Sequence, residues 1–218
     1  MSLHESAIGE FERFIRAENF PCVGARSALA TKNMMFADAG DLTKPSSGTV
    51  LASLQTFAAA TQPRLTTFVA LYAGTPDLSE RGFETALWRQ LAILAQEDRH
   101  RFAPDPSIST DPESSDFAIS IGGKGFFVVG MHPGASRLAR RAPFAALAFN
   151  RHDQFRALKA SGGYGRMRDI VRRRDIALQG DTNPMLADHG DRSEASQYSG
   201  RDVSRDWVCP FMANRHAA

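Results

Sequence analysis

The chain has few cysteines and no long apolar run. Cys22 and Cys209 are the only two cysteines among 218 residues, too few for a disulfide framework, so we expect free thiols in a reducing compartment. No segment approaches the roughly 18 consecutive apolar residues that span a bilayer. The polar residues 1–5 lack the basic and apolar regions of a signal peptide. A disulfide-stabilised secreted domain and a membrane helix are therefore not expected, and we predict a cytoplasmic protein.

A large excess of charge of one sign is also missing. The 26 lysine and arginine residues nearly balance the 24 aspartate and glutamate residues, which gives a formal net charge of +2. Such a chain has no global field that would attract nucleic acid or a membrane surface. Its length suits one domain with a sizeable core, so we predict a single domain over residues 1–218.

Helices and strands are indicated by the spacing of the apolar residues. Helical spacing predicts helices over residues 4–18, 24–33, 47–62, 79–100, 153–160 and 164–178. Runs of β-forming residues predict strands over residues 65–72 and 145–150, and a hairpin with a glycine-rich turn over residues 116–130. This order of elements predicts an α+β fold with a small, mostly antiparallel sheet of about four strands packed with helices. An α/β fold with one right-handed crossover is the alternative.

The C-terminal tail after residue 178 has no regular spacing. Its Gln, Asp, Asn, Glu, Tyr and Arg residues are interleaved with Gly and Pro in a way that fits neither a helix nor a strand. We interpret this irregular tail as part of a functional site rather than of the core.

Short motifs spread along the chain carry a family resemblance. They lie at residues 20–22 (Phe-Pro-Cys), 132–140, 149–155, 174–175, 178–186, 193–201 and 207–211. In this order they resemble the YqcI/YcgG family, whose characterised members include haem-dependent N-hydroxylases of arginine and of a related guanidine. The resemblance implies a haem b cofactor, O2, an electron-donating reductase and a small guanidine or amino-acid substrate, and it leaves a homo-oligomer open. Ser196 stands where members often carry a basic residue, so a different substrate is expected if Ser196 lines the pocket.

Two residues are candidates for the axial haem ligand. Cys22 directly precedes a predicted helix, whose N-terminal amides would stabilise a thiolate, and thiolate ligation to haem favours O–O cleavage. The alternative for Cys22 is a small buried hydrophobic residue. His132 follows a predicted strand and is the rival ligand, unless it is bonded to nearby backbone. Cys209 is expected to be structural.

Basic residues near these candidates suggest anion binding. We assign Arg137 and Arg140 to a haem propionate or a substrate carboxylate, with a solvated basic turn as the alternative. His152 is a candidate distal-pocket donor or a structural cap. A non-haem iron triad of His132, His152 and Asp188 has little support from their spacing.

Carboxylates of the tail suggest the substrate. A guanidinium in a dry pocket requires an aligned carboxylate, and the family implies such a substrate. We assign Asp181 and Glu194, with His152, to catalysis, although each carboxylate could instead cap a turn. Further residues are assigned to substrate binding, namely Asn183, Asp188, Tyr198 and Arg201, the last for the carboxylate of an amino acid.

The resulting hypothesis is a haem-dependent monooxygenase that hydroxylates a nitrogen of an arginine-like guanidine. One alternative is a non-catalytic haem-binding or sensing protein. Another is a basic nucleic-acid-binding module, because the predicted helix over residues 164–178 carries five arginines. We expect that helix instead to be solvated on its basic side and to bury Met167, Ile170 and Val171.

Overall fold

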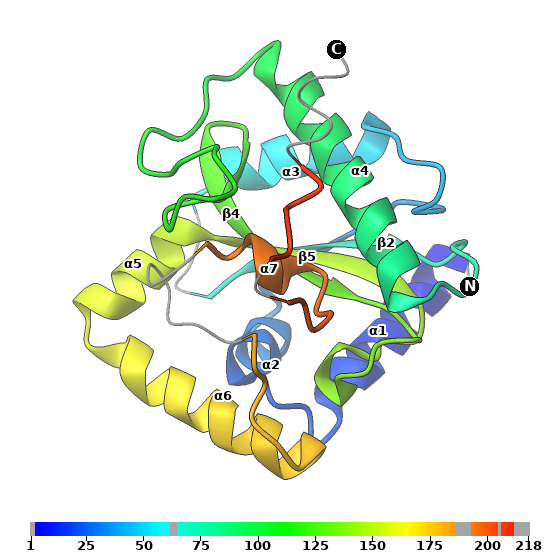
Figure 1. The fold of residues 1–218 in the computed structure, drawn as a ribbon, viewed down its shortest axis with the longest axis vertical. Coiled ribbons are helices and arrows are strands. Elements are labelled where there is room, and N and C mark those ends of the chain that lie inside the picture. Colours follow the sequence, from blue (N-terminus) through cyan, green and yellow to red (C-terminus); the bar gives the residue numbers. More distant parts are fainter. Residues whose placement is uncertain (1–2, 62–64, 186–192, 205, 212–218) are drawn as a thin grey trace.

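The computed structural model describes residues 3–61, 65–185, 193–204 and 206–211. They form a mixed sheet with helices on both faces (Figure 1). The helices are α1 (Leu3–Arg16), α2 (Val23–Ala30), α3 (Gly48–Ala59), α4 (Glu80–Arg99), α5 (His152–Ala160), α6 (Gly163–Gln179) and α7 (Ala195–Tyr198), with a short 3-10 helix η1 (Leu138–Arg140). The strands are β1 (Met34–Asp38), β2 (Thr67–Tyr72), β3 (Ile119–Ile121), β4 (Lys124–Met131) and β5 (Ala145–Arg151).

The sheet has five strands in the order β1-β2-β5-β4-β3. All neighbours are antiparallel except β1 and β2, which run parallel and are joined through α3. The predicted α+β fold with a mostly antiparallel sheet is confirmed. A parallel connection, the feature of the α/β alternative, occurs at one edge only.

Strand β1 is absent from the sequence-based prediction of about four strands. Its residues, Met-Met-Phe-Ala-Asp, follow a predicted helix directly and show no alternation of apolar and polar residues. Ala37 is the only one of them that is fully buried. The strand is fixed by its parallel pairing with β2, from Met34 opposite Thr67 to Asp38 opposite Leu71, which local sequence does not reveal.

Alternate residues of the sheet serve two separate cores, because side chains along a strand point to opposite faces. On one face, Phe68, Tyr72 and Phe149 belong to a core cluster with residues of α3 and α4, including the fully buried Trp88. On the other face, the intervening residues of β2 and β5 pack with the buried side chains of α1, such as Phe11, and with Leu29 of α2. The second face also carries the cavity described below.

The C-terminal tail belongs partly to the first core, so its interpretation as a site rather than core is incomplete. Tyr198 of α7 is fully buried and stacks on Trp88 with 5.5 Å between ring centroids. Cys209 and Phe211 are buried in the same cluster. The tail can approach β4 because residue 130 is glycine: a Cβ there would lie 2.8 Å from the Tyr198 carbonyl oxygen.

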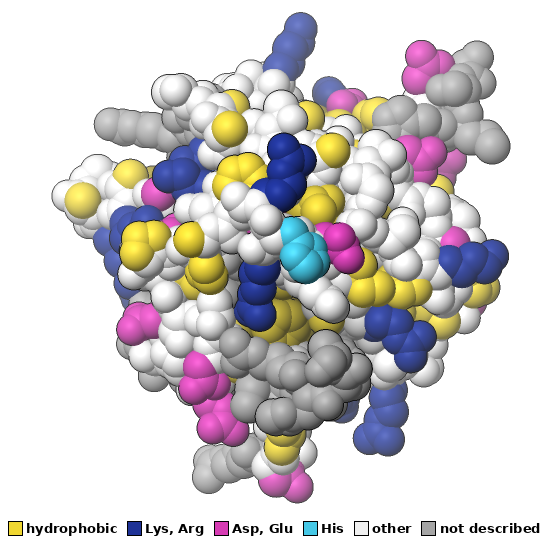
Figure 2. All heavy atoms as spheres, turned by 90° about the horizontal axis from the view of Figure 1, so that it is seen from above, with side chains coloured by type: hydrophobic (Ala, Val, Ile, Leu, Met, Phe, Trp, Pro, Cys, Tyr) yellow, Lys and Arg dark blue, Asp and Glu magenta, His cyan; other side chains and the backbone are white. Residues whose placement is uncertain are grey.

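The surface furthest from α6 is mixed in character. Figure 2 shows basic, acidic and hydrophobic side chains interspersed there, without a large region of one charge. Over the part of the chain that the structure describes, no helix is both long and apolar enough to cross a bilayer.

Candidate functional site

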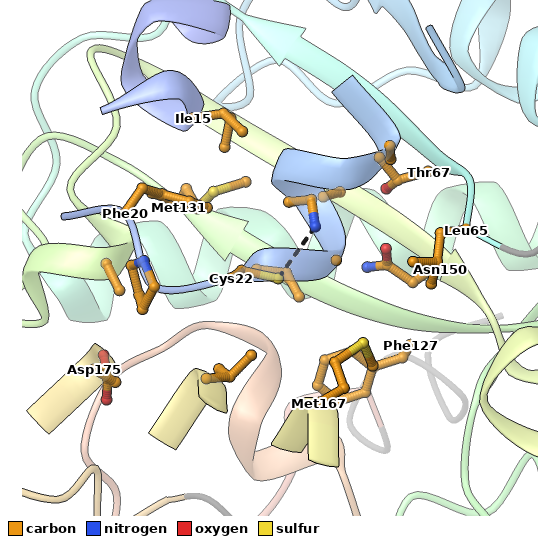
Figure 3. Close-up of a pocket in the computed structure, with 18 of the residues that line it drawn as sticks. Ile15, Phe20, Cys22, Leu65, Thr67, Phe127, Met131, Asn150, Met167 and Asp175 are labelled. Carbon is orange, nitrogen blue, oxygen red and sulfur yellow. Dashed lines mark hydrogen bonds between the residues drawn. The ribbon is translucent and has the colours of Figure 1, made fainter. Parts of the chain in front are cut away.

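A cavity of about 340 Å³ lies on the second face of the sheet, under α2 and α6 (Figure 3). Its sheet side is mainly apolar, with Val69, Val129, Met131 and Ala148 among the lining residues. A volume of this size suits a small-molecule site. Polar and charged side chains also line the cavity, and those most relevant to the chemistry are Cys22, Arg140, Asn150, Asp175, Glu194 and Gln197.

Cys22 reaches the cavity from the start of α2, where it is the N-cap residue. Its Sγ accepts a hydrogen bond from the Ala25 amide at 3.4 Å (Figure 3), so the predicted contact between sulfur and helix N-terminus is present. Burial raises the pKa of the Cys22 thiol, while the amides of Ala25 and Gly24 and the charge of Arg140 act in the opposite direction. The sulfur is therefore a protonated thiol at neutral pH, and a bound cation would favour its thiolate.

Arg140 joins β4 to α7. Its guanidinium donates to the carbonyl oxygens of Gly130 at 2.8 Å, Gln197 at 3.1 Å and Tyr198 at 3.4 Å. Burial lowers the pKa of Arg140 to about 10, while Asp175 and Cys22 counteract this effect. The side chain therefore remains a cation at neutral pH beside the Cys22 sulfur.

Arg137 is buried and bound by two carboxylates. Its Nη2 donates to Asp175 at 2.6 Å, and its Nη1 donates to Asp181. The alternative prediction, that Arg137 and Arg140 lie in a solvated basic turn, is thus wrong. Arg137 is 8% exposed, and Arg140 is partly buried. Both guanidiniums line the cavity and donate to groups of the protein itself, so a propionate would compete with these partners. Arg137 Nε is buried without a hydrogen-bond partner among the described residues.

Glu194 belongs to a buried hydrogen-bonded network. Its Oε1 lies 2.9 Å from His152 Nε2 and accepts a hydrogen bond from the Tyr198 hydroxyl at 2.6 Å. Burial, followed by the Glu194 charge, raises the pKa of Tyr198, so this hydroxyl remains a donor. Glu194 is part of the cavity lining, whereas His152 and Tyr198 are not among the described lining residues. They hold Glu194 in place rather than facing a ligand.

Several predicted residues lie elsewhere. His132 packs on Phe83 with ring centroids 4.3 Å apart and does not belong to the described lining of the cavity. Burial lowers the pKa of His132, with Glu80 opposing the shift. Its Nδ1 is buried without a hydrogen-bond partner among the described residues. The structure therefore places His132 away from Cys22's cavity, in the core beside α4.

Of the tail residues that the sequence assigned to the site, some line the cavity and others do not. Arg201 donates to Glu84 at 2.6 Å and is not among the described lining residues. Asn183 does line the cavity, whereas Asp181 binds Arg137 and keeps 70% of its side chain exposed. Ser196 is not among the described lining residues. The remaining assigned residue, Asp188, lies outside the described residues.

Other lining residues were not assigned from the sequence. Asn150, Asp175 and Gln197 lie within the family-like motifs, but only the fold shows that they share a cavity. The inner face of α6 contributes residues at helical spacing, namely Tyr164, Met167, Arg168, Val171, Arg172 and Asp175. The prediction that α6 buries Ile170 is wrong, because this side chain is 38% exposed.

The residues of the cavity fit a haem in part. Cys22 offers one sulfur for an axial position, and the apolar lining suits the faces of a porphyrin. Four arginines of the described chain line the cavity, namely Arg137, Arg140, Arg168 and Arg172. The predicted propionate partners Arg137 and Arg140 already donate to groups of the protein, and Arg168 is paired with Asp169. Within the described ranges, no three His, Cys, Asp or Glu side chains gather to hold a metal ion directly. A haem iron needs only an axial side chain, since the porphyrin provides its other ligands.

Comparisons with known proteins agree with the motifs. The model of the YqcI/YcgG family matches residues 11–212. Uncharacterized protein YcgG of Bacillus subtilis (strain 168) is 29% identical over 208 residues, covering 89% of this chain and 81% of YcgG. Uncharacterized protein YqcI of the same organism is 27% identical over 210 residues, covering 90% and 82%. No solved structure matches the chain. The chain belongs to the YqcI/YcgG family.

Proposed function

We propose that the protein is a haem-dependent monooxygenase that hydroxylates a nitrogen of an arginine-like guanidine. The observation that supports this most is the pairing of Cys22 and Glu194 in one cavity: a helix-capping sulfur and a buried carboxylate both line a mainly apolar space. The first group suits a metal, and the second suits a cationic substrate.

On the cofactor side, Cys22 would be the axial ligand. The α2 amides and the Arg140 cation both favour a thiolate at this position, and apolar side chains make up most of the surrounding surface. A bound haem would supply the activation of O2, and a thiolate ligand promotes cleavage of the O–O bond. The reaction consumes O2, two electrons and two protons, places one oxygen atom on the substrate nitrogen and releases the other as water. An electron donor is therefore required.

On the substrate side, Glu194 would accept hydrogen bonds from the guanidinium. Its orientation is fixed by His152 and Tyr198, which reduces the conformational freedom that binding must remove. The amides of Asn150 and Gln197 line the same cavity and could contact neutral parts of the substrate. Asp181, assigned to catalysis from the sequence, would act only indirectly by orienting Arg137.

One observation favours the second candidate, a non-catalytic haem-binding or sensing protein. Glu194 Oε1 already has two hydrogen-bond partners within the protein, so the carboxylate could serve structure alone. Product formation under reducing conditions with O2 separates this candidate from the monooxygenase.

The experiment is an optical titration of the haem-loaded protein with arginine and related guanidines. Substrate bound beside a haem perturbs its absorption spectrum, so binding can be followed before the reductase is known. Glu194→Gln keeps the size of the side chain but removes its charge, and it should weaken binding by about two orders of magnitude or more, because an unpaired buried charge costs ~3–5 kcal/mol. Glu97→Gln, at an exposed position of α4, is the matched control and should bind as the parent does. The guanidine assignment fails if no guanidine perturbs the spectrum, or if both variants bind alike.

A further inference from the structure

The two faces of α6 have different surroundings. Its inner face lines the cavity through residues such as Met167, Val171 and Asp175. Its outer face, formed by the remaining positions at helical spacing, consists of Arg166, Asp169, Ile170, Arg173, Ile176 and Ala177, all of them exposed. Figure 1 shows α6 along the lower border of the fold, beside α5. One helix thickness, about 10–12 Å with side chains, therefore separates the cavity from this surface.

The outer face combines positive charge with exposed apolar groups. Arg166 and Arg173 lie two turns apart on it, and Ile170 and Ile176 are 38% and 41% exposed. The acid on this face, Asp169, is neutralised by Arg168 at 2.9 Å. Arginine is enriched at protein interfaces, and the exposed isoleucines beside it offer apolar surface that a partner can bury. Binding of single-stranded nucleic acid would instead favour exposed aromatic rings, and none occurs among these six residues.

We propose that the outer face of α6 docks an acidic electron-carrier protein of the ferredoxin type. This inference rests on the proposed function, which requires electrons from a partner. The partner's negative surface would pair with Arg166 and Arg173, its apolar contacts would cover Ile170 and Ile176, and its iron–sulfur cluster would lie one helix away from the cavity. Each docking event would deliver one electron from the reduced cluster, so two events would supply the two electrons of one turnover.

Charge complementarity explains why this face is favoured over others. Electrostatic attraction accelerates encounter between oppositely charged proteins and selects their orientation. The face opposite α6 shows interspersed charges of both signs (Figure 2). Three arginines of α6 lie outside the described lining of the cavity, namely Arg166, Arg173 and Arg174. Arg174 donates to the carbonyl oxygens of Glu18 and Phe20, so Arg166 and Arg173 are the pair that can serve an interface without altering the site.

The test uses a plant-type [2Fe–2S] ferredoxin as the probe and a charge-reversed double variant, Arg166→Glu with Arg173→Glu. We expect binding of oxidised ferredoxin, measured by calorimetry, to weaken at least about tenfold. Added salt should weaken binding to the parent protein and have little effect on the variant. Stopped-flow reduction of the haem by reduced ferredoxin should slow in proportion, whereas reduction by dithionite should be unchanged.

The control is Arg89→Glu with Arg99→Glu, which reverses two exposed arginines of α4 and should leave both measurements unchanged. A milder pair, Arg166→Gln with Arg173→Gln, should shift both in the same direction by less, which guards against misfolding of the reversed variant. The proposal is overturned if the α6 variant binds ferredoxin as the parent does, or if the α4 control loses as much. It is also overturned if a single-stranded RNA binds the parent more tightly than ferredoxin and loses binding in the α6 variant. The calorimetric comparison needs no haem. If the parent protein takes up no haem, the proposed function is refuted, and the calorimetry still shows whether ferredoxin binds at the outer face of α6.

Discussion

Replacing Arg140 by methionine tests the connection between β4 and the tail. The guanidinium makes two hydrogen bonds of 3.1 Å or less to carbonyl oxygens, on Gly130 and Gln197. A hydrogen bond from a charged donor contributes ~1.5–3 kcal/mol, so the two together give ~3–6 kcal/mol. The burial that lowers the pKa of Arg140 to about 10 from 12.5 offsets about 3 kcal/mol of this. We expect Arg140→Met to reduce the free energy of unfolding by about 2 kcal/mol.

Chemical and thermal unfolding followed by circular dichroism measure this change. For a chain of this length, about 2 kcal/mol corresponds to a fall in Tm of roughly 4–8 °C. Arg89→Met, at an exposed position of α4, is the control and should change stability by less than about 0.5 kcal/mol. If Arg140→Met is no more destabilising than the control, the guanidinium does not anchor the tail, and the placement of Glu194 and Gln197 at the cavity must be explained otherwise.

Three further predictions concern packing, ion pairing and pH. Gly130→Ala should destabilise the protein by ~1–3 kcal/mol, because the added Cβ would lie 2.6 Å from Leu87 Cδ1. Gly165→Ala in α6 should stabilise it by up to about 1 kcal/mol, because no described heavy atom beyond its chain neighbours and the helix backbone lies within 4 Å of the added Cβ, and equal Tm values for the two variants would contradict this packing. Arg201→Met should destabilise the protein by ~3 kcal/mol, because it leaves the buried Glu84 carboxylate without its cation, and it should leave guanidine binding unchanged. Weaker guanidine binding at unchanged Tm would contradict this and support a role of Arg201 in substrate binding. Burial raises the pKa of both cysteines from 9.0, so the free energy of unfolding should fall as the pH rises above 9, by at most ~1 kcal/mol per cysteine between pH 9 and 10. A variant with both cysteines replaced by alanine should lose this part of the fall in stability, and a variant with the same pH dependence as the parent would show that neither thiol is perturbed.

Local periodicity was sufficient to predict most of the fold. The stripe of Phe83, Leu87, Leu91 and Leu94 predicted α4 correctly, and all four side chains are fully buried. The glycine-rich turn correctly predicted the hairpin of β3 and β4. Strand β1 was missed because its identity depends on parallel pairing with β2, and Ile170 was misplaced because several rotations of α6 could bury an apolar stripe.

The candidate site was predictable only where chemistry is local. The cap contact of Cys22 with α2 follows from its position before the helix. The engagement of Arg137 by Asp175, 38 positions away, and of Arg201 by Glu84, 117 positions away, does not. Such pairings depend on which elements the fold brings together. Glu194 and Arg201 therefore have different roles although both lie in the tail: Glu194 lines the cavity, and Arg201 pairs with Glu84.

The ligand claim is tested most directly by the absorption spectrum of the haemin-loaded protein. Titration with haemin should saturate at about one equivalent, and the ferrous carbonyl form should show the red-shifted Soret band that thiolate ligation gives. Cys22→Ser should lose this band, while Cys209→Ser, which alters the buried cysteine of the other core, should keep it. Absence of saturable haemin binding would contradict the cofactor, and a Cys22→Ser spectrum like the parent's, with loss of the spectrum in His132→Ala, would contradict the assignment of Cys22 as the ligand.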